Sequence, residues 1–350
     1  MKKSILLLLT IFVTMALAAQ NKPINFTNKA VFTKSGSGTI TKFIALLPIP
    51  QTNEYQDVSN VSVSDGTFIE DKNYGNQMLY FSDEKLPGNP FELYSTFDIT
   101  PKVINIDLSK VTDIKEYDPN STPCKRHLGN RGEYIDITNP YIVETGNKLW
   151  AESKNVLEYA RNCYEHVASN FKYIKGSWRT LSQILDLKAG ECGDFSTLVV
   201  NLLRYKGIPS RHNICIRHDE VGYHVWVDFY LEGYGWIPLD ATYKHDNPSG
   251  DYFGNYDGKC IVLAQDIQYD LTDKITDTLF MNQVCAYWYW YNGSNCELTI
   301  NHFMKNNGST GITPIQNDTD NPRMYNLKGQ IVDTNYKGIV IINGEKFIRK

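Results

Sequence analysis

Three residues of the types used in nucleophilic catalysis, Cys192, His224 and Asp240, occur at separate points of the chain. Cys192 lies between Gly190 and Gly193 and is followed at once by apolar residues at helical spacing, which predicts a helix start. Unpaired N–H groups at a helix start favour a thiolate over a thiol and could hold a developing oxyanion. The need for a small residue in a tight turn would equally explain a lone cysteine here. Whether Cys192 is a nucleophile therefore depends on the positions of His224 and Asp240.

His224 and Asp240 are predicted to meet at the open end of one β-hairpin. Residues 222–231 alternate like a strand, with His224 and Asp228 on one face, and residues 235–239 return after a turn. Asp240 follows the second strand, 16 residues after His224. A carboxylate beside an imidazole orients the ring, which can serve Cys192 as general base and the leaving amine as general acid.

The elements that position these residues are predicted from hydrophobic periodicity. Residues 156–167 and 195–203 have helical spacing, and the second helix should end at Gly207. Strands are expected at 211–217, 222–231 and 235–239. Residues 26–110 show β patterns, including a hairpin at Asp65-Gly66 and a strand through Ile104 and Leu108, which together predict a β-sandwich.

Four segments, 190–195, 202–211, 224–228 and 235–242, resemble the transglutaminase-like domain of the papain-related superfamily, in the chain order Cys…His…Asp. The resemblance covers roughly residues 139 to 270. It implies an α+β domain in which Cys192 is the nucleophile, His224 the base and Asp240 the orienting acid. It also implies a second oxyanion donor upstream of the cysteine, either Trp178 or Gln183. The resemblance implies no metal and no cofactor for this sequence.

Both ends of the chain suggest export. Residues 1–18 resemble a signal peptide, with a Lys pair, an apolar run and a small-x-small end at Ala16–Ala18, and no later apolar stretch reaches spanning length. The predicted order continues with a β-sandwich at 19–138, the catalytic domain at 139–305 and a linker at 306–322. A β module at 323–350, with a turn at Asn343-Gly344, resembles type IX secretion sorting domains. We therefore expect a periplasmic, cell-surface or secreted protein.

Composition narrows the possible functions. A net charge of −4 argues against a general nucleic-acid binder. Seven cysteines are an odd number, so at least one is unpaired, and Cys192 is expected to be that one. The chain has no C-x-x-C pair for a zinc site, and His212, His218 and Asp219 are expected to be solvated loop residues rather than metal ligands.

The sequence therefore predicts an exported cysteine acyl-transfer enzyme that acts on amide bonds of peptides or proteins, cell-wall peptide included. A protease or amidase is favoured over a cross-linking transglutaminase. The alternative is a catalytically idle module that binds a peptide or a glycan. In that case the aromatic run at 286–291 is a candidate stacking platform, although alternating aromatics in a strand are more often half buried.

Overall fold

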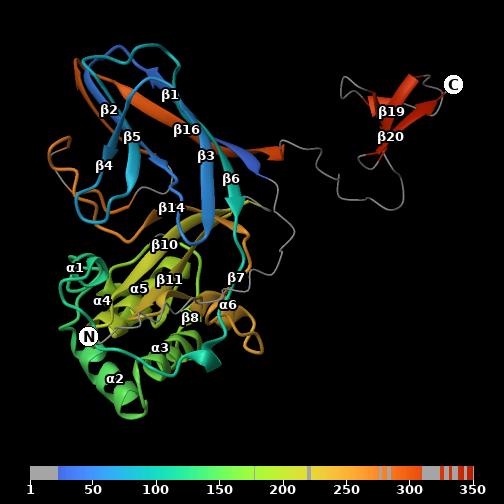
Figure 1. Cartoon of the computed structure of the whole chain (residues 1–350). Helices are drawn as coiled ribbons and strands as arrows, with labels where there is room; N and C mark the ends of the chain where they lie inside the picture. The colour runs from blue at the N-terminus through green and yellow to red at the C-terminus, as the bar shows by residue number, and fades with distance from the viewer. Residues whose placement is uncertain are drawn as a thin grey trace, which may run out of the picture.

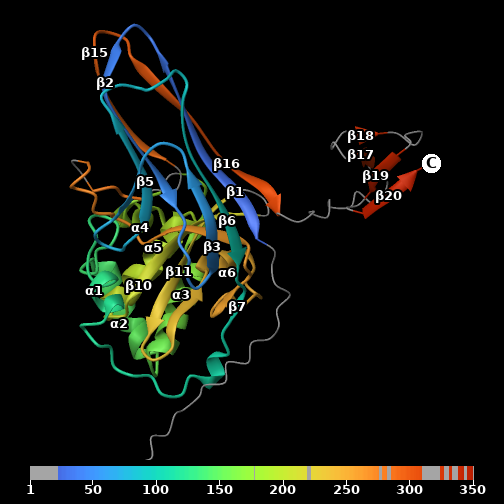
Figure 2. The same cartoon turned by 45° about the horizontal axis from the view of Figure 1, so that its top comes forward.

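A computed structural model describes residues 23–176, 178–218, 222–275, 278–281 and 285–309, with strands at 324–326, 331–332, 338–342 and 345–349. The expected signal peptide at 1–18 lies outside the described residues. Figures 1 and 2 show an α+β protein in which a unit of two β-sheets lies beside a unit where helices surround a smaller sheet. The α+β class agrees with the prediction.

The two-sheet unit consists of two antiparallel sheets that share one apolar core. Their strand orders are β16-β1-β6-β3 and β15-β2-β5-β4. Phe32 and Leu93 of the first sheet pack with Phe43 and Leu47 of the second. The strands are β1 Ile24–Ser35, β2 Thr39–Ile49, β3 Gln56–Val63, β4 Thr67–Glu70, β5 Gln77–Asp83, β6 Phe91–Pro101, β15 Ala286–Asn292 and β16 Glu297–Ser309.

Strands β15 and β16 lie in the two-sheet unit and not with the residues of 139–285 that precede them. β16 pairs with β1 along its whole length, from Ile24 opposite Ser309 to Ser35 opposite Glu297. β15 pairs with β2 in the other sheet. β16 also runs to Ser309, past the expected linker start at 306, and the rest of that linker lies outside the described residues. Pairing between such distant segments leaves no local sequence pattern, so the boundary at 305 was placed too late for this unit.

The turn at Asp65-Gly66 does not form the predicted hairpin. β3 pairs with β6 and β4 pairs with β5, so this turn carries the chain from one sheet to the other. The strand expected through Ile104 and Leu108 is also shorter. β7 covers only Ile104–Asn105 and pairs with β13, Asn255–Tyr256, before a 3₁₀ helix at Leu108–Lys110. A turn signal marks a chain reversal, but tertiary packing decides which sheet receives the next strand.

The second unit has a four-stranded antiparallel sheet in the order β12-β11-β10-β14. Its strands are β10 Ser210–Arg217, β11 Tyr223–Leu231, β12 Gly235–Leu239 and β14 Cys260–Gln265. Its helices and short strands are α1 Thr122–Arg126, α2 Pro140–Ala151, α3 Val156–Asn170, β8 Lys172–Tyr173, α4 Leu181–Leu187, β9 Ala189–Gly190, α5 Cys192–Tyr205 and α6 Ala241–Asp246. The predicted helices and the three predicted strands of this unit are confirmed, with bounds shifted by a few residues.

The two faces of this sheet pack against different partners. On one face Val225 and Phe229 of β11 join the core that contains Phe195 and Leu198 of α5. On the other face Trp226 packs with Cys215, Val262 and Tyr55, and Tyr55 lies in the loop between β2 and β3. The alternation of β11 therefore directs one set of side chains to the helices and the other towards the two-sheet unit.

Four strands near the C-terminus form a separate sheet, in the order β18-β17-β19-β20. They are β17 Met324–Asn326, β18 Ile331–Val332, β19 Gly338–Ile342 and β20 Glu345–Arg349. This sheet lies apart from the two larger units in both views (Figures 1 and 2). Ile342 pairs with Glu345, while the expected turn residues between them lie outside the described residues. Over the part of the chain that is described, we find no helix of the length and apolarity needed to cross a membrane.

Candidate active site

Cys192 is the first residue of α5, as the sequence predicts. The preceding residue, Glu191, is extended and forms the N-cap. Cys192 is partly exposed, whereas every residue from Gly193 to Arg204 is buried. A helix buried over this length is held by packing rather than by its own propensity, and its N-terminal residue is left open to a substrate.

The two glycines beside Cys192 are required by close packing. A Cβ on Gly190 would lie 2.4 Å from the Cβ of Asp194, and a Cβ on Gly193 would lie 2.8 Å from the Trp178 ring. Asp194 is fully buried. Its carboxylate accepts a hydrogen bond from the backbone N–H of Glu191 at 3.0 Å and pairs with the guanidinium of Arg179. These contacts fix the first turn of α5, which carries Cys192.

His224 and Asp240 are in direct contact at the open end of the β11–β12 hairpin. The strands pair from Leu231 opposite Gly235 to Val227 opposite Leu239, and Asp240 comes next. Its Oδ2 lies 2.6 Å from Nε2 of His224, and its Oδ1 accepts the backbone N–H of Tyr243 at 3.0 Å. The carboxylate therefore caps α6 with one oxygen and orients the imidazole with the other.

Cys192 and Asp240 both act on the charge of His224. Burial of the ring opposes its charged form, but the charge and hydrogen bond of Asp240, followed by the hydrogen bond of Cys192, raise the pKa of His224 well above its ordinary value. Tyr243 stacks on the imidazole, with ring centroids 4.7 Å apart and planes 8° apart. His224 thus has Asp240 and Cys192 as partners and a fixed ring plane.

Asp228 shares the strand face of His224 but belongs to another cluster. Its carboxylate is bound by the hydroxyl of Tyr55 and by Nε of Arg211, the latter at 3.0 Å. Burial raises the pKa of Asp228, and the Arg211 charge opposes that shift. The cluster of Tyr55, Arg211 and Asp228 connects the two units. The carboxylate beside the imidazole is therefore that of Asp240.

The two candidate second oxyanion donors have different positions. The Trp178 ring lies against Gly193, and its indole N–H donates to the Thr197 hydroxyl at 3.3 Å. The Gln183 side chain instead accepts the backbone N–H of Thr180 at 3.0 Å, where it caps α4. Trp178 is therefore the one packed beside Cys192, although its N–H is bound to the helix.

His212 is not a solvated loop residue, as the sequence had suggested, but is fully buried on β10. Its Nε2 lies 3.2 Å from the Thr197 hydroxyl and its Nδ1 lies 3.3 Å from Asp266. Asp266 also pairs with Arg204 and with Nδ1 of His127 at 2.9 Å. These side chains form a buried polar network that contacts α5 through Thr197 and Arg204. Sequence spacing could not reveal it, because burial of His212 depends on tertiary packing.

His218 follows β10, with its Nε2 2.9 Å from the carbonyl oxygen of Gly258, and Asp219 lies outside the described residues. The described residues contain no group of three or more His, Cys, Asp or Glu side chains that could hold a metal ion.

All seven cysteines lie in the described residues and none is in a disulfide bond. The expectation that Cys192 is the one unpaired thiol is therefore wrong. Exposure and partners distinguish it instead, because five of the other cysteines are buried. Cys285 is also partly exposed, but desolvation raises its pKa to about 12. Cys192 is the cysteine whose side chain interacts with the imidazole of His224, whereas the Cys215 thiol donates to the backbone carbonyl oxygen of that residue.

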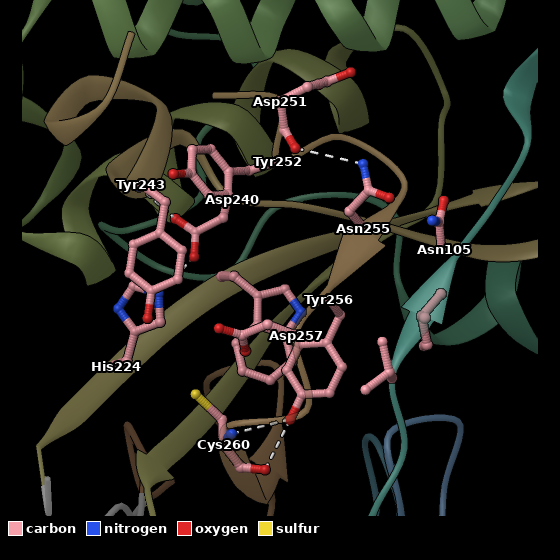
Figure 3. A pocket seen from close by; sticks show the side chains of 13 residues that line it. Asn105, His224, Asp240, Tyr243, Asp251, Tyr252, Asn255, Tyr256, Asp257 and Cys260 are labelled. Carbon is pink, nitrogen blue, oxygen red and sulfur yellow. Dashed lines mark hydrogen bonds and ion pairs between the residues drawn. The ribbon is translucent and has the colours of Figure 1, made fainter. Parts of the chain in front are cut away.

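A pocket of about 460 Å³ opens beside His224 and Asp240 (Figure 3). It is lined by Val103, Ile104, Asn105, His224, Trp226, Asp240, Tyr243, Asp251, Tyr252, Asn255, Tyr256, Asp257 and Cys260. Two of its walls come from residues 103–105 and 251–257, neither of which the sequence analysis identified. Residues 104–108 were expected to form a strand, but their position opposite residues 251–257 depends on the tertiary pairing of β7 with β13.

The segment that contains the three candidate residues matches a known family. Residues 144–241 match the model of the transglutaminase-like superfamily, from within α2 to the start of α6. The chain therefore carries a transglutaminase-like superfamily domain, which includes Cys192, His224 and Asp240.

Individual relatives are distant. An uncharacterized protein of Haemophilus influenzae is 22% identical over 56% of this chain and 62% of its own length, so the match spans less than two thirds of that relative. A candidate cysteine protease of Cytophaga hutchinsonii has 15% identity and a TM-score of 0.49, over 85% of this chain and 95% of that one. The periplasmic domain of TgpA from Pseudomonas aeruginosa has 11% identity and a TM-score of 0.35, over 65% and 89%.

Proposed function

We propose that this protein is a cysteine acyl-transfer enzyme that hydrolyses amide bonds of peptides or proteins. Cys192 is the nucleophile, His224 the general base and acid, and Asp240 the residue that orients the imidazole. The observation that carries the proposal is the 2.6 Å contact between Asp240 and a buried imidazole that also interacts with Cys192 at the start of α5.

The reaction follows from these contacts. Asp240 occupies Nε2 of His224, so Nδ1 is the nitrogen that serves Cys192. The thiolate attacks the carbonyl carbon, and the unpaired N–H groups at the start of α5 stabilise the oxyanion. The C–N bond then breaks as His224 gives its proton to the leaving amine, which leaves a thioester. Water attacks the thioester, His224 takes its proton, and C–S cleavage releases the acid and the thiolate.

Water is the favoured acceptor because the pocket offers no unpaired carboxylate to a lysyl amine. Among the described lining residues, Asp251 pairs with Arg161 at 3.2 Å, and Asp257 pairs with Lys259 at 3.7 Å. Asp240 is bound to His224. A protonated amine entering the site would therefore lose water without gaining a charge partner.

The test is selective reaction of Cys192. Iodoacetamide near neutral pH should label Cys192 first, ahead of Cys285, the other partly exposed thiol. A synthetic peptide library, read by mass spectrometry, should be cleaved by the wild type and by Cys285→Ala but not by Cys192→Ala. Labelling of Cys192 no faster than Cys285, together with an uncut library, would favour the idle binding module. Incorporation of a fluorescent primary amine in place of cleavage would favour a cross-linking enzyme.

The site is proposed to act outside the cytoplasm, on peptides that include cell-wall stem peptides, and the C-terminal sheet is proposed to be a sorting module. The signal-like residues 1–18 and the separate four-stranded sheet support this placement. A chain truncated before Asn321 should keep wild-type labelling of Cys192 but remain in the periplasm of its host. Undiminished release of the truncated chain would contradict the sorting role.

A further inference from the structure

The pocket beside His224 has walls made mainly of apolar groups. Trp226 lies two residues after His224 on the same strand face, and their ring centroids are 6.4 Å apart. Val103 and Ile104 face it from β7 and the residue before it, and Val103 is 62% exposed although it is a branched apolar residue. A pocket of about 460 Å³ falls within the range of roughly 300–1,000 Å³ that small ligands occupy. It can hold a large side chain and adjoining backbone.

The three tyrosines of the pocket already use their hydroxyl groups elsewhere. Tyr256 donates to the carbonyl oxygen of Cys260 at 2.7 Å and accepts its N–H at 3.1 Å. The Tyr243 hydroxyl is bound by Arg217, and the Tyr252 hydroxyl accepts from Asn247 at 3.0 Å. Figure 3 shows these rings arranged around the opening next to His224. What they mainly offer a ligand is ring surface.

The carboxylates of the pocket are also occupied. Asp257 accepts the backbone N–H of Lys259 at 3.0 Å in addition to its ion pair. Asp251 forms an ion pair with Arg161, whose guanidinium carbon also lies 4.4 Å from the ring centroid of Phe253. A lysine or arginine side chain in the pocket would have to displace one of these partners. A charged side chain of either sign would also lose water against mainly apolar walls, so charged occupants are disfavoured.

We propose that this pocket binds a bulky apolar or aromatic side chain of the peptide substrate and thereby selects the bond presented to Cys192. The inference rests on the proposed function, because the pocket is connected to Cys192 through His224, which lines the pocket and interacts with that thiol. Burying a large apolar side chain against the aromatic walls supplies the selectivity, since the carboxylates and the tyrosine hydroxyls of the lining have partners within the protein.

Binding to Cys192→Ala tests the pocket without requiring any chemistry. Isothermal titration would compare four acetylated peptide amides, Ala-Phe-Ala, Ala-Gly-Ala, Ala-Lys-Ala and Ala-Glu-Ala. The Phe peptide should bind at least about tenfold more tightly than the Gly peptide, and the Lys and Glu peptides no better than Gly. Equal affinities, or tightest binding of the Lys or Glu peptide, would overturn the proposal.

Two exposed valines provide a matched pair of variants on the same background. Val103→Asp places a charge at the pocket mouth and should weaken Phe-peptide binding about tenfold. Val61→Asp makes the same change at another exposed valine, which does not line the pocket, and should leave binding unchanged. Equal effects of the two variants would contradict the pocket as the binding site. If Cys192 proves unreactive while the Phe preference persists, the proposed enzyme fails and the binding pocket stands.

Discussion

Asp240 Oδ2 lies 2.6 Å from His224 Nε2, although His224 is on β11 and Asp240 follows β12, 16 residues later. The contact depends on the pairing of Val227 with Leu239. Asp240 follows Leu239 directly, and His224 lies three residues beyond Val227 towards the same open end of the hairpin. A slip of one residue would turn one of the two side chains to the opposite face. The hairpin register and the α6 cap together hold the carboxylate in place.

Replacing Asp240 by Asn should leave a folded protein with very low turnover. The amide keeps the shape of the side chain but can favour the wrong tautomer of His224, and the corresponding change in a serine-protease triad costs about 10⁴-fold in kcat. We expect a loss of roughly 10²–10⁴-fold in peptide cleavage. Steady-state kinetics measures it, and circular dichroism checks the fold. Cleavage within twofold of wild type would mean that another group orients His224.

The protonation of His224 should also change in Asp240→Asn. In the wild type the pKa of His224 is raised well above its ordinary value, despite burial, by Asp240 and then by Cys192. The ring therefore stays protonated until the pH rises through that raised pKa. Without the carboxylate charge, burial should shift the titration to lower pH. NMR titration of the imidazole measures both proteins, and an unchanged midpoint would contradict the role of Asp240.

The sequence was most informative where the signal is local. The helix after Cys192 and the hairpin with His224 and Asp240 follow from periodicity and turn residues within short windows. β16 could not be assigned in this way, because its partner β1 lies at the other end of the chain. The burial of His212 and the pocket wall at residues 103–105 are likewise products of packing between distant segments.

Gly193→Ala should disturb the start of α5 even though alanine favours helices. The new Cβ would lie 2.8 Å from the rigid Trp178 ring, so the indole or the helix must move. We expect a loss of about 1–3 kcal/mol in the free energy of unfolding and slower alkylation of Cys192. Urea denaturation and labelling rates measure the two effects. Gly222→Ala is the control, because a Cβ there meets no atom within 4 Å, and equal behaviour of both variants would refute the packing argument.

The buried His127 should make the protein less stable in acid. Desolvation, opposed by Asp266, lowers the pKa of His127 to about 4, while an exposed histidine titrates near 6.5. Between these values the unfolded chain binds a proton that the folded protein excludes, so the free energy of unfolding falls as the pH drops from about 6.5 to 4. This one group contributes roughly 3 kcal/mol of that fall.

Urea denaturation across this pH range, on the wild type and on His127→Gln, isolates the contribution of His127. The glutamine amide can still donate to Asp266, which accepts from His127 Nδ1 at 2.9 Å, but it cannot take up a proton. The variant should therefore lose less stability in acid than the wild type, by roughly 3 kcal/mol at pH 4. His245→Gln, at a partly exposed histidine, is the matched control for the substitution itself. Parallel stability curves for wild type and His127→Gln would show that His127 takes up its proton equally well in the folded and unfolded chains.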